Sequence, residues 1–470
     1  MRGHPKTLFE KIWAAHRIAA LDSATDLIAI DRILLHERTG GIALRGIAES
    51  GRKVLDTTQV FATMDHVVDT RPGRTDATLM ESGREFITAT REAAHATGIR
   101  LFDLGDPAQG IVHVISPERG IVLPGLTLVC PDSHTGTQGA LGALAWGIGS
   151  TEAEHALATG ALRARKPKTM RISISGRLAF GVTAKDLALA LIGRLGAGGA
   201  SGHIIEFAGE AIESLDIEAR LTLCNMATEL SAFSAIIAPD ARALDYLWGK
   251  PHAPSGALWD NAAAYWNTLK SDEGAVFDMN LNFDACEVSP MVTWGTSPQQ
   301  AISIDAHVPD LMASPRDTDE SHARALTYMD LSPGTKIAGL PIGAAFIGSC
   351  TNSRISDLRR AAAILSGRKV AEGVKAICVP GSTPVKHQAE AEGLDRIFRE
   401  AGFEWRESGC SMCFFSGGES FGTRQRVISS TNRNFESRQG PQTRTHLASP
   451  ETVAASAIAG CIADPRRFVP

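Results

Sequence analysis

The chain has 470 residues, 44% of them hydrophobic, and a formal net charge of 47 − 52 = −5. At roughly 150 residues a domain, this length predicts about three domains. The acidic balance disfavours nucleic acid as a partner, because proteins that bind it present a basic surface. Eight cysteines are too few for a disulfide scaffold, and no apolar stretch reaches the length of a membrane span. We therefore expect a soluble protein of the reducing cytoplasm.

The first third of the chain predicts an alternation of strands and helices. Apolar residues at helical spacing predict a helix over 7–18, with Thr7 and Glu10 placed as a capping box. A second helix is predicted to start at Thr151, with Glu154 as the second residue of its capping box. Short apolar runs predict strands at 27–30, 60–64, 109–114 and 126–130.

Acidic and imidazole side chains accompany three of these runs. Asp65 and His66 end one, His113 lies inside another, and Asp132, Ser133 and His134 follow the last. Each histidine alone is more often a surface pair or a hydrogen-bonded core residue than a catalyst. The third group is more informative, because ligands of open α/β sheets bind at the carboxyl ends of strands.

The middle of the chain carries weaker signals. Thr183 and Asp186 predict a capped helix over 184–195, and the glycine-rich stretch 196–202 precedes a strand at 203–207. A dinucleotide-binding loop follows a strand and opens a helix, so this stretch is interpreted as a helix stop and a candidate domain boundary. Asn225 and Glu229 are spaced to share one face of a helix over 221–229. Residues 250–340 show little periodicity.

Three cysteines dominate the last third. A strand over 344–350 delivers Cys350 to its carboxyl end, and a helix follows whose N-terminus should lower the pKa of that thiol. Cys410 and Cys413 form a C-x2-C pair. Three such cysteines suit zinc, a redox pair, an iron–sulfur cluster or simply three small buried hydrophobic residues. The spacing alone favours three buried hydrophobic residues. The residues that flank the cysteines favour the iron–sulfur cluster instead.

A [4Fe–4S] cluster with three thiolates leaves one iron without a cysteine, and an exposed iron can grip a substrate oxygen as a Lewis acid. Asn432, Arg433 and Arg438 follow the C-x2-C pair closely. Arginine forks suit carboxylates, although two nearby arginines are more often merely solvated.

Blocks along nearly the whole chain resemble the aconitase superfamily, and within it the isopropylmalate isomerase branch. They are Lys6–Glu10, Phe61–His66, Gly110–His113, Asp132–Thr135, Leu223–Met226, Gly348–Arg354, Gly409–Cys413 and Asn432–Phe435. The resemblance implies an α/β fold of three domains, 1–200, 201–325 and 326–470, around a [4Fe–4S] cluster held by the last. It also implies that the mobile swivel domain with the carbon-proton base is a separate small subunit, forming a heterodimer or a higher assembly.

The implied activity is a hydro-lyase that isomerises 2-isopropylmalate and 3-isopropylmalate through 2-isopropylmaleate in leucine biosynthesis. The substrate is then a small dicarboxylic hydroxy acid. By resemblance, the metal ligands are Cys350, Cys410 and Cys413; the catalytic residues are Asp65, His66, His113, Asp132, His134 and Glu229; and the substrate-contacting or site-shaping residues are Ser133, Asn225, Asn432, Arg433 and Arg438.

The chain also departs from the family pattern. The unusual residues are Arg38–Gly41, Pro131, Gln138, Phe414–Phe421 and Ser437, the last in place of a glycine. They leave open a related hydro-lyase acting on another 2-alkylmalate, of the citramalate/citraconate type. A third alternative is a non-catalytic iron sensor that binds RNA when its cluster is lost; the retained Asp–His pairs and the absence of a basic stripe argue against it.

Overall fold

The computed structural model describes residues 4–310, 319–413 and 418–468. The chain forms two compact units. Unit 1 comprises Met1–Asp65, Glu85–Arg177 and Ala200–Asp284, and unit 2 comprises His66–Arg84, Leu178–Gly199 and Ala285–Pro470. The chain passes from unit 2 to unit 1 between Gly199 and Ala200, inside the glycine-rich stretch 196–202. The division into three domains at residues 200 and 325 stays a prediction.

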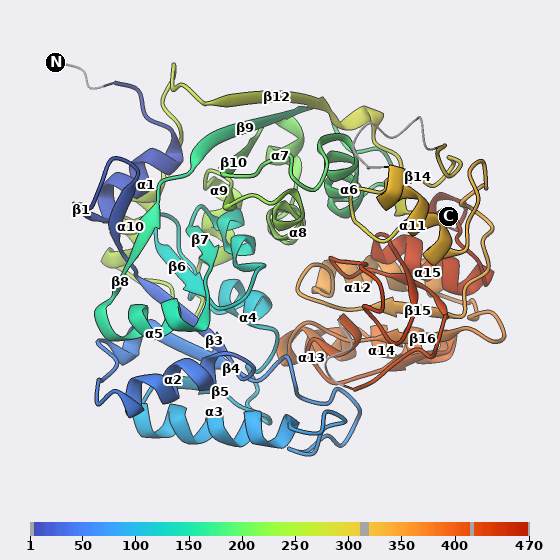
Figure 1. Cartoon of the computed structure of the whole chain (residues 1–470), viewed down its shortest axis with the longest axis horizontal. Helices are drawn as coiled ribbons and strands as arrows, with labels where there is room; N and C mark the ends of the chain where they lie inside the picture. Colours follow the sequence, from blue (N-terminus) through green and yellow to red (C-terminus); the bar gives the residue numbers. More distant parts are fainter. Residues whose placement is uncertain (1–3, 311–318, 414–417, 469–470) are drawn as a thin grey trace. The chain divides into compact units, whose positions relative to one another are not determined.

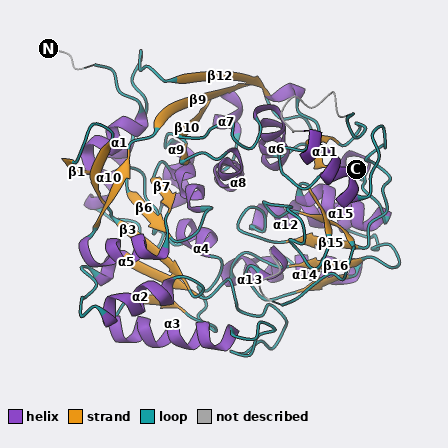
Figure 2. Cartoon of the chain, viewed as in Figure 1, coloured by secondary structure: helices purple, strands orange, loops and turns teal. Residues whose placement is uncertain are grey.

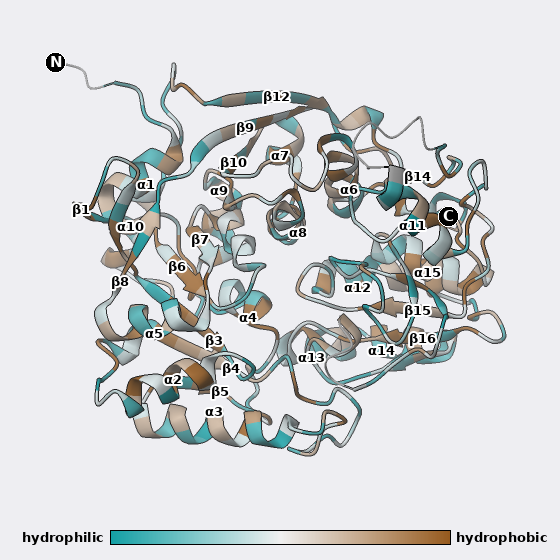
Figure 3. Cartoon of the chain, viewed as in Figure 1, coloured by the Kyte–Doolittle hydropathy of each residue, from teal (hydrophilic) through white to brown (hydrophobic). Residues whose placement is uncertain are grey.

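Unit 1 contains a five-stranded parallel sheet in the order β5-β4-β3-β6-β7 (Figure 1). Its central strands are continuous apolar runs buried on both faces, as parallel strands covered by helices require. Figure 3 shows this hydrophobic colouring along β3 and β6. The strands are β3 Arg32–His36, β4 Val60–Thr63, β5 Arg100–Phe102, β6 Thr127–Cys130 and β7 Leu144–Gly147, and the helices between and after them are α2 Gly40–Glu49, η1 Thr57–Gln59, α3 Gly83–Thr97, α4 Val112–Glu118, η2 Thr135–Leu141 and α5 Ser150–Thr159.

A second parallel sheet in unit 1 has the order β11-β10-β9-β12, and a three-stranded antiparallel sheet has the order β1-β2-β8. The strands are β1 Arg17–Ala20, β2 Thr25–Ala29, β8 Ala161–Arg165, β9 Lys168–Ser175, β10 His203–Ala208, β11 Ser234–Ile236 and β12 Met279–Asp284. The helices are α1 Leu8–His16, α7 Glu210–Ser214, α8 Ile217–Met226, η3 Ala227–Leu230, α9 Ala241–Leu247 and α10 Ala257–Trp266.

Unit 2 is built on a five-stranded parallel sheet in the order β17-β16-β15-β18-β19, with β15 at its centre. Figure 2 shows α12, α14 and α15 around these strands. The strands are β13 Met291–Thr293, β14 Ala301–Ser303, β15 Ala344–Ile347, β16 Lys375–Cys378, β17 Phe403–Trp405, β18 Arg426–Ser429 and β19 Arg444–Leu447. The helices are α6 Ala184–Leu195, η4 Ala285–Glu287, α11 Asp319–Met329, α12 Ile355–Leu365, α13 Thr383–Ala391, α14 Leu394–Ala401, η6 Ser411–Cys413, α15 Pro450–Ala459 and η8 Pro465–Arg467.

Local capping predicted two helix starts correctly. Glu10 N donates to Thr7 Oγ1 at 3.1 Å and Thr7 N to Glu10 Oε2 at 2.9 Å, which opens α1. Thr183 N donates to Asp186 Oδ2 at 2.8 Å at the start of α6. The predicted start at Thr151 is wrong, because Gly149 N donates to Glu152 Oε2 and α5 begins one residue earlier.

Two other predictions are corrected by the structure. The run 109–114 is not a strand: α4 begins at Val112, with Ile115 N bonded to Ile111 O at 2.9 Å. An apolar run buried on every side does not distinguish a strand from a buried helix. The helix predicted over 221–229 ends at Met226 and continues as the 3₁₀ turn η3, so Asn225 and Glu229 lie on two different elements.

The changed segment Arg38–Gly41 has a packing explanation within unit 1. Gly40 and Gly41 open α2, and both are buried. A Cβ at Gly40 would lie 2.7 Å from Leu35 Cβ, and one at Gly41 would lie 2.5 Å from Thr90 Oγ1. Two glycines therefore let α2 approach its neighbours closely. Among the described residues, no helix is long and apolar enough to cross a lipid bilayer.

Candidate active site

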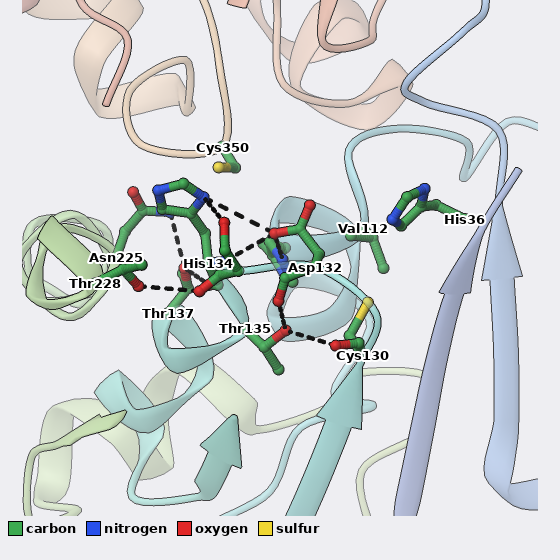
Figure 4. Close-up of polar contacts among 12 residues, drawn as sticks. His36, Val112, Cys130, Asp132, His134, Thr135, Thr137, Asn225, Thr228 and Cys350 are labelled. Carbon is green, nitrogen blue, oxygen red and sulfur yellow. Dashed lines mark hydrogen bonds and ion pairs between the residues drawn. The ribbon is translucent and has the colours of Figure 1, made fainter. Parts of the chain in front are cut away.

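Asp132 organises the carboxyl end of β6 in unit 1 (Figure 4). Its Oδ1 accepts a hydrogen bond from His134 N at 2.8 Å and lies 3.0 Å from His113 Nε2. The His113 ring is almost fully buried and is supplied by α4. The strand-end prediction thus brings Asp132 and His113 together, although His113 stands on a helix.

His134 forms a second imidazole–carboxylate pair. Its Nε2 lies 2.9 Å from Glu229 Oε1, with both side chains buried, and its Nδ1 lies 3.2 Å from Ser133 Oγ. A carboxylate against an imidazole selects its tautomer and stabilises its protonated form. The two pairs therefore provide proton donors and acceptors of fixed orientation.

Asn225, near the end of α8, is hydrogen-bonded to the 3₁₀ turn η2 that follows His134. Its Nδ2 donates to Thr137 Oγ1 at 2.8 Å, and Thr137 Oγ1 donates to His134 O at 2.5 Å. Thr228 Oγ1 donates to Ser133 O at 3.0 Å (Figure 4). Asn225 is fully buried, so its amide shapes the backbone that carries His134.

Gln138, noted in the sequence only as a departure, lies in this network. Its Nε2 donates to His113 Nδ1 at 3.2 Å, and the side chain is fully buried. The amide NH₂ is only a donor, so this bond leaves the ring proton on His113 Nε2, facing Asp132. Gln138 Oε1 has no partner within the described part of the chain.

Asp65 follows β4 and is fully buried in unit 1. Its Oδ2 accepts from Val112 N at 2.8 Å, the first residue of α4, and its own N–H donates to Glu37 Oε2 at 3.0 Å. A helix N-terminus favours the charged carboxylate. Sequence reasoning missed Glu37, which follows β3 and could have been found by the strand-end rule that identified Asp132.

His66, the next residue, belongs to unit 2 and lines a pocket there with Asp69, Thr70, Thr78 and Ser411 among its neighbours. The C-x2-C segment is anchored nearby. Thr70 Oγ1 donates to Ser411 Oγ at 2.8 Å, and Glu407 N donates to Thr70 O at 2.7 Å.

Cys350 follows the central strand β15, as predicted. Its carbonyl accepts from Arg354 Nη2 at 3.0 Å, and this arginine is almost fully buried. Helix α12 begins only at Ile355, with Thr351–Arg354 in between, so the predicted effect of its dipole on the Cys350 pKa stays a prediction.

Cys410 and Cys413 lie on one tight turn. Cys413 N donates to Cys410 O at 2.9 Å, and Met412 between them packs in a core cluster with Phe346 and Val427. Met412 O accepts from Gln439 Nε2 at 2.7 Å. Of the changed segment Phe414–Phe421, residues 414–417 lie outside the described residues, and Phe421 joins the same core cluster.

Asn432 connects the two cysteine segments. Its Nδ2 donates to Cys350 Sγ at 3.4 Å, and its Oδ1 lies 3.9 Å from Cys413 Sγ. Arg438 Nη2 donates to Cys413 Sγ at 3.6 Å. Two thiols from distant segments thus converge on one buried amide. Cys410 lies on the same tight turn as Cys413. This set of soft donors, each under 9% exposed, fits an iron–sulfur cluster.

Other cysteines differ from these three. Burial raises the pKa of the Cys130, Cys224 and Cys378 thiols, which favours inert, protonated side chains.

The substrate-binding candidates of unit 2 lie on the loop after β18. Arg433 and Arg438 are partly buried, and Arg438 Cζ lies 5.0 Å from the centroid of the Phe435 ring. Ser437 adopts a left-handed backbone with φ +63°, a conformation that favours glycine. A glycine would adopt this backbone with less strain than Ser437 does.

Paired acids and imidazoles lie at the end of one parallel strand, and after another the Cys350 and Cys413 thiols converge on Asn432. These features are those of an aconitase-type protein. A family model described as "Aconitase family (aconitate hydratase)" matches residues 10–460, and the chain belongs to this family. The 3-isopropylmalate dehydratase large subunit 1 of Bradyrhizobium diazoefficiens is 51% identical to it over 466 residues, covering 98% of this chain and 96% of the relative.

Proposed function

We propose that this chain is the large subunit of a 3-isopropylmalate dehydratase. It acts as a hydro-lyase that interconverts 2-isopropylmalate and 3-isopropylmalate through 2-isopropylmaleate, a step of leucine biosynthesis. The observation that carries the proposal is 51% identity to a 3-isopropylmalate dehydratase large subunit over nearly the full length of both chains.

Membership of the aconitase family implies an iron–sulfur cluster. Cys350, Cys410 and Cys413 would hold it as a [4Fe–4S] group with one iron lacking a cysteine ligand. When bound, such a group supplies a Lewis acid that weakens the bond to a departing hydroxyl. The convergence of Cys350 and Cys413 on Asn432 supports this ligand set.

The protein's own residues then handle protons and position the substrate. His66, with Asp65 beside it in the chain, protonates the departing hydroxyl. His113 and His134 hold protons at their Nε2 atoms, facing Asp132 and Glu229, and are proposed to lie around the hydroxyl oxygen of the substrate. The support for this assignment is the distances of 3.0 and 2.9 Å between those rings and carboxylates.

Substrate carboxylates are proposed to meet arginines of the loop after β18. Arg433 and Arg438 present planar donors suited to a carboxylate, and Asn432 of the same loop contributes a polar contact. Ser133 of unit 1 is proposed separately as a substrate contact. Asn225 is proposed to shape the site or to contact substrate, and one hydrogen bond from its amide is donated to Thr137.

The base that removes the carbon proton is proposed to come from a small subunit. The support is the relative's printed description as a large subunit, which implies a partner. A location in the cytoplasm stays a prediction.

A second candidate is a hydro-lyase for another 2-alkylmalate. The observation that favours it is Gln138, a departure from the family pattern that contacts His113 directly. A methylene in an apolar pocket changes selectivity by only about 1–3 kcal/mol, so partial cross-reactivity is expected under either candidate.

The test uses the anaerobically reconstituted chain with a cognate small subunit. The kcat/KM would be compared for 3-isopropylmalate, citramalate and a monocarboxylic analogue. We expect 3-isopropylmalate to be best, with little turnover when the small subunit is omitted. A clear preference for citramalate would establish the second candidate, and good turnover of the monocarboxylate would refute both.

A further inference from the structure

Lys185 is a fully buried lysine on α6 of unit 2. It stands between Thr183 and Asp186, whose mutual hydrogen bonds open that helix. Its Nζ donates to Ser430 O at 3.0 Å and to Thr431 O at 2.5 Å. A cationic side chain is costly to bury, so its two bonds to successive carbonyls indicate a specific task.

The two carbonyls lie between the end of β18 and Asn432. Strand β18 ends at Ser429, and Ser430 and Thr431 lead directly to Asn432. Both residues are fully buried, and a buried carbonyl beyond the end of a strand needs a partner. A lysine ammonium offers three donors from one point, so it can hold two successive peptide groups at once.

The residue directly after these two carbonyls carries the amide that contacts the thiols. Asn432 Nδ2 donates to Cys350 Sγ at 3.4 Å, and Oδ1 lies 3.9 Å from Cys413 Sγ. Rotation of either preceding peptide would move both amide atoms away from the sulfurs. Ser430 is also held by its N–H, which donates to Phe346 O at 3.0 Å, leaving its carbonyl side to Lys185.

We propose that Lys185 is a positioning residue that fixes the Ser430–Thr431 backbone and thereby holds Asn432 against the Cys350 and Cys413 sulfurs. The inference rests on the proposed function, because it assigns these sulfurs to the cluster. Lys185 acts through Asn432, so its effect on the cluster passes through that amide.

The proposal predicts that removing Lys185 or Asn432 has one shared effect. The variants are Lys185→Met, Asn432→Ala and the double variant, each reconstituted with the small subunit. Lys375→Met is the matched control. Lys375 is partly exposed, opens β16 at the end of the unit 2 sheet opposite to Ser430, and pairs with Glu419 at 3.9 Å. Iron and sulfide content, the electron paramagnetic resonance spectrum of the reduced cluster and kcat/KM are measured.

At equal cluster content, Lys185→Met should lower kcat/KM by about tenfold or more and shift the spectrum as Asn432→Ala does. The double variant should lie within about twofold of the worse single variant, because residues acting as a unit are not additive. The control should keep the wild-type spectrum, and its effect should multiply with that of Asn432→Ala.

Multiplying effects of Lys185→Met and Asn432→Ala, or an unchanged spectrum in Lys185→Met, would overturn the proposal. If Lys185→Met does not retain the cluster, the same cycle is run with Lys185→Gln, which keeps amide donors. Loss of the cluster in both lysine variants while Asn432→Ala keeps it would also overturn the proposal, because Lys185 would then act beyond Asn432. An inactive or cluster-free wild-type complex would instead refute the proposed function.

Discussion

The Asp132→Asn substitution removes one negative charge from the His113 pair while preserving size. Asp132 Oδ1 lies 3.0 Å from His113 Nε2, and the carboxylate side chain is 15% exposed. Because His113 Nδ1 accepts from Gln138 Nε2, the ring is neutral and donates its Nε2 proton to the carboxylate, a hydrogen bond to a charged group that is worth about 1.5–3 kcal/mol. The asparagine oxygen keeps a neutral hydrogen bond worth about 1 kcal/mol, so we expect a loss of about 1–2 kcal/mol.

Expressed in the transition state, that loss lowers kcat/KM by about 5–30-fold. The assay is alkene hydration by the reconstituted complex, normalised to iron content and to folded protein by circular dichroism. Asp260→Asn, an exposed aspartate in the first turn of α10, is the control and should keep full activity. A fully loaded Asp132→Asn enzyme within about twofold of wild type would refute the assigned role.

Three further predictions concern stability and the His113 network. Ser437 Oγ accepts from Gln442 N at 3.0 Å, and both Ser437→Gly and Ser437→Ala lose this bond. Only glycine tolerates the left-handed backbone freely. Ser437→Gly should therefore be more stable than Ser437→Ala by about 1 kcal/mol in urea denaturation, and equal stability of the two variants would contradict the backbone argument. Burial raises the pKa of Asp186 to about 7, so its folded state binds the proton more tightly; this stabilisation is complete below the unfolded pKa and is lost as pH rises through about 7. Asp186→Asn should therefore flatten the fall in unfolding free energy between about pH 4 and pH 7, and an unchanged pH profile would count against it. Gln138→Leu removes the donor to His113 Nδ1 and should lower kcat/KM by about tenfold or more, whereas activity within about twofold would make that bond irrelevant to catalysis.

Local signals in the sequence were sufficient where a few neighbouring residues decide the structure. The Thr7–Glu10 and Thr183–Asp186 caps involve residues three apart, and both helices start as predicted. The strand that delivers Cys350 was equally clear, because a short apolar run at the centre of a parallel sheet is buried on both faces.

Competing local signals account for the errors. Gly149 with Glu152 and Thr151 with Glu154 are overlapping candidates for one helix start, and only the folded chain shows that the first pair forms. In the run 109–114, burial on every side erased the periodicity that separates a helix from a strand.

Long-range contacts could not be predicted from one sequence. The ammonium of Lys185 meets carbonyls 245 and 246 residues away, and neither segment carries a pattern that predicts the pairing. Gln138 became a candidate only when its contact with His113 was seen, whereas Glu37 follows β3 and was overlooked although the strand-end rule applies to it. The chemistry of the site residues came from the family resemblance, and their pairing within each unit came from the fold.

The most direct test of the account is whether three cysteines hold a cluster on which turnover depends. Iron, acid-labile sulfide and isomerisation of 3-isopropylmalate would be measured for wild type, Cys410→Ser and Cys286→Ser after anaerobic reconstitution, Cys286 being an exposed cysteine outside the proposed ligand set. The account predicts about four irons and about four sulfides per chain for wild type and Cys286→Ser, with most of both and the activity lost in Cys410→Ser. A Cys410→Ser protein that binds iron and sulfide normally and still isomerises the substrate would contradict it.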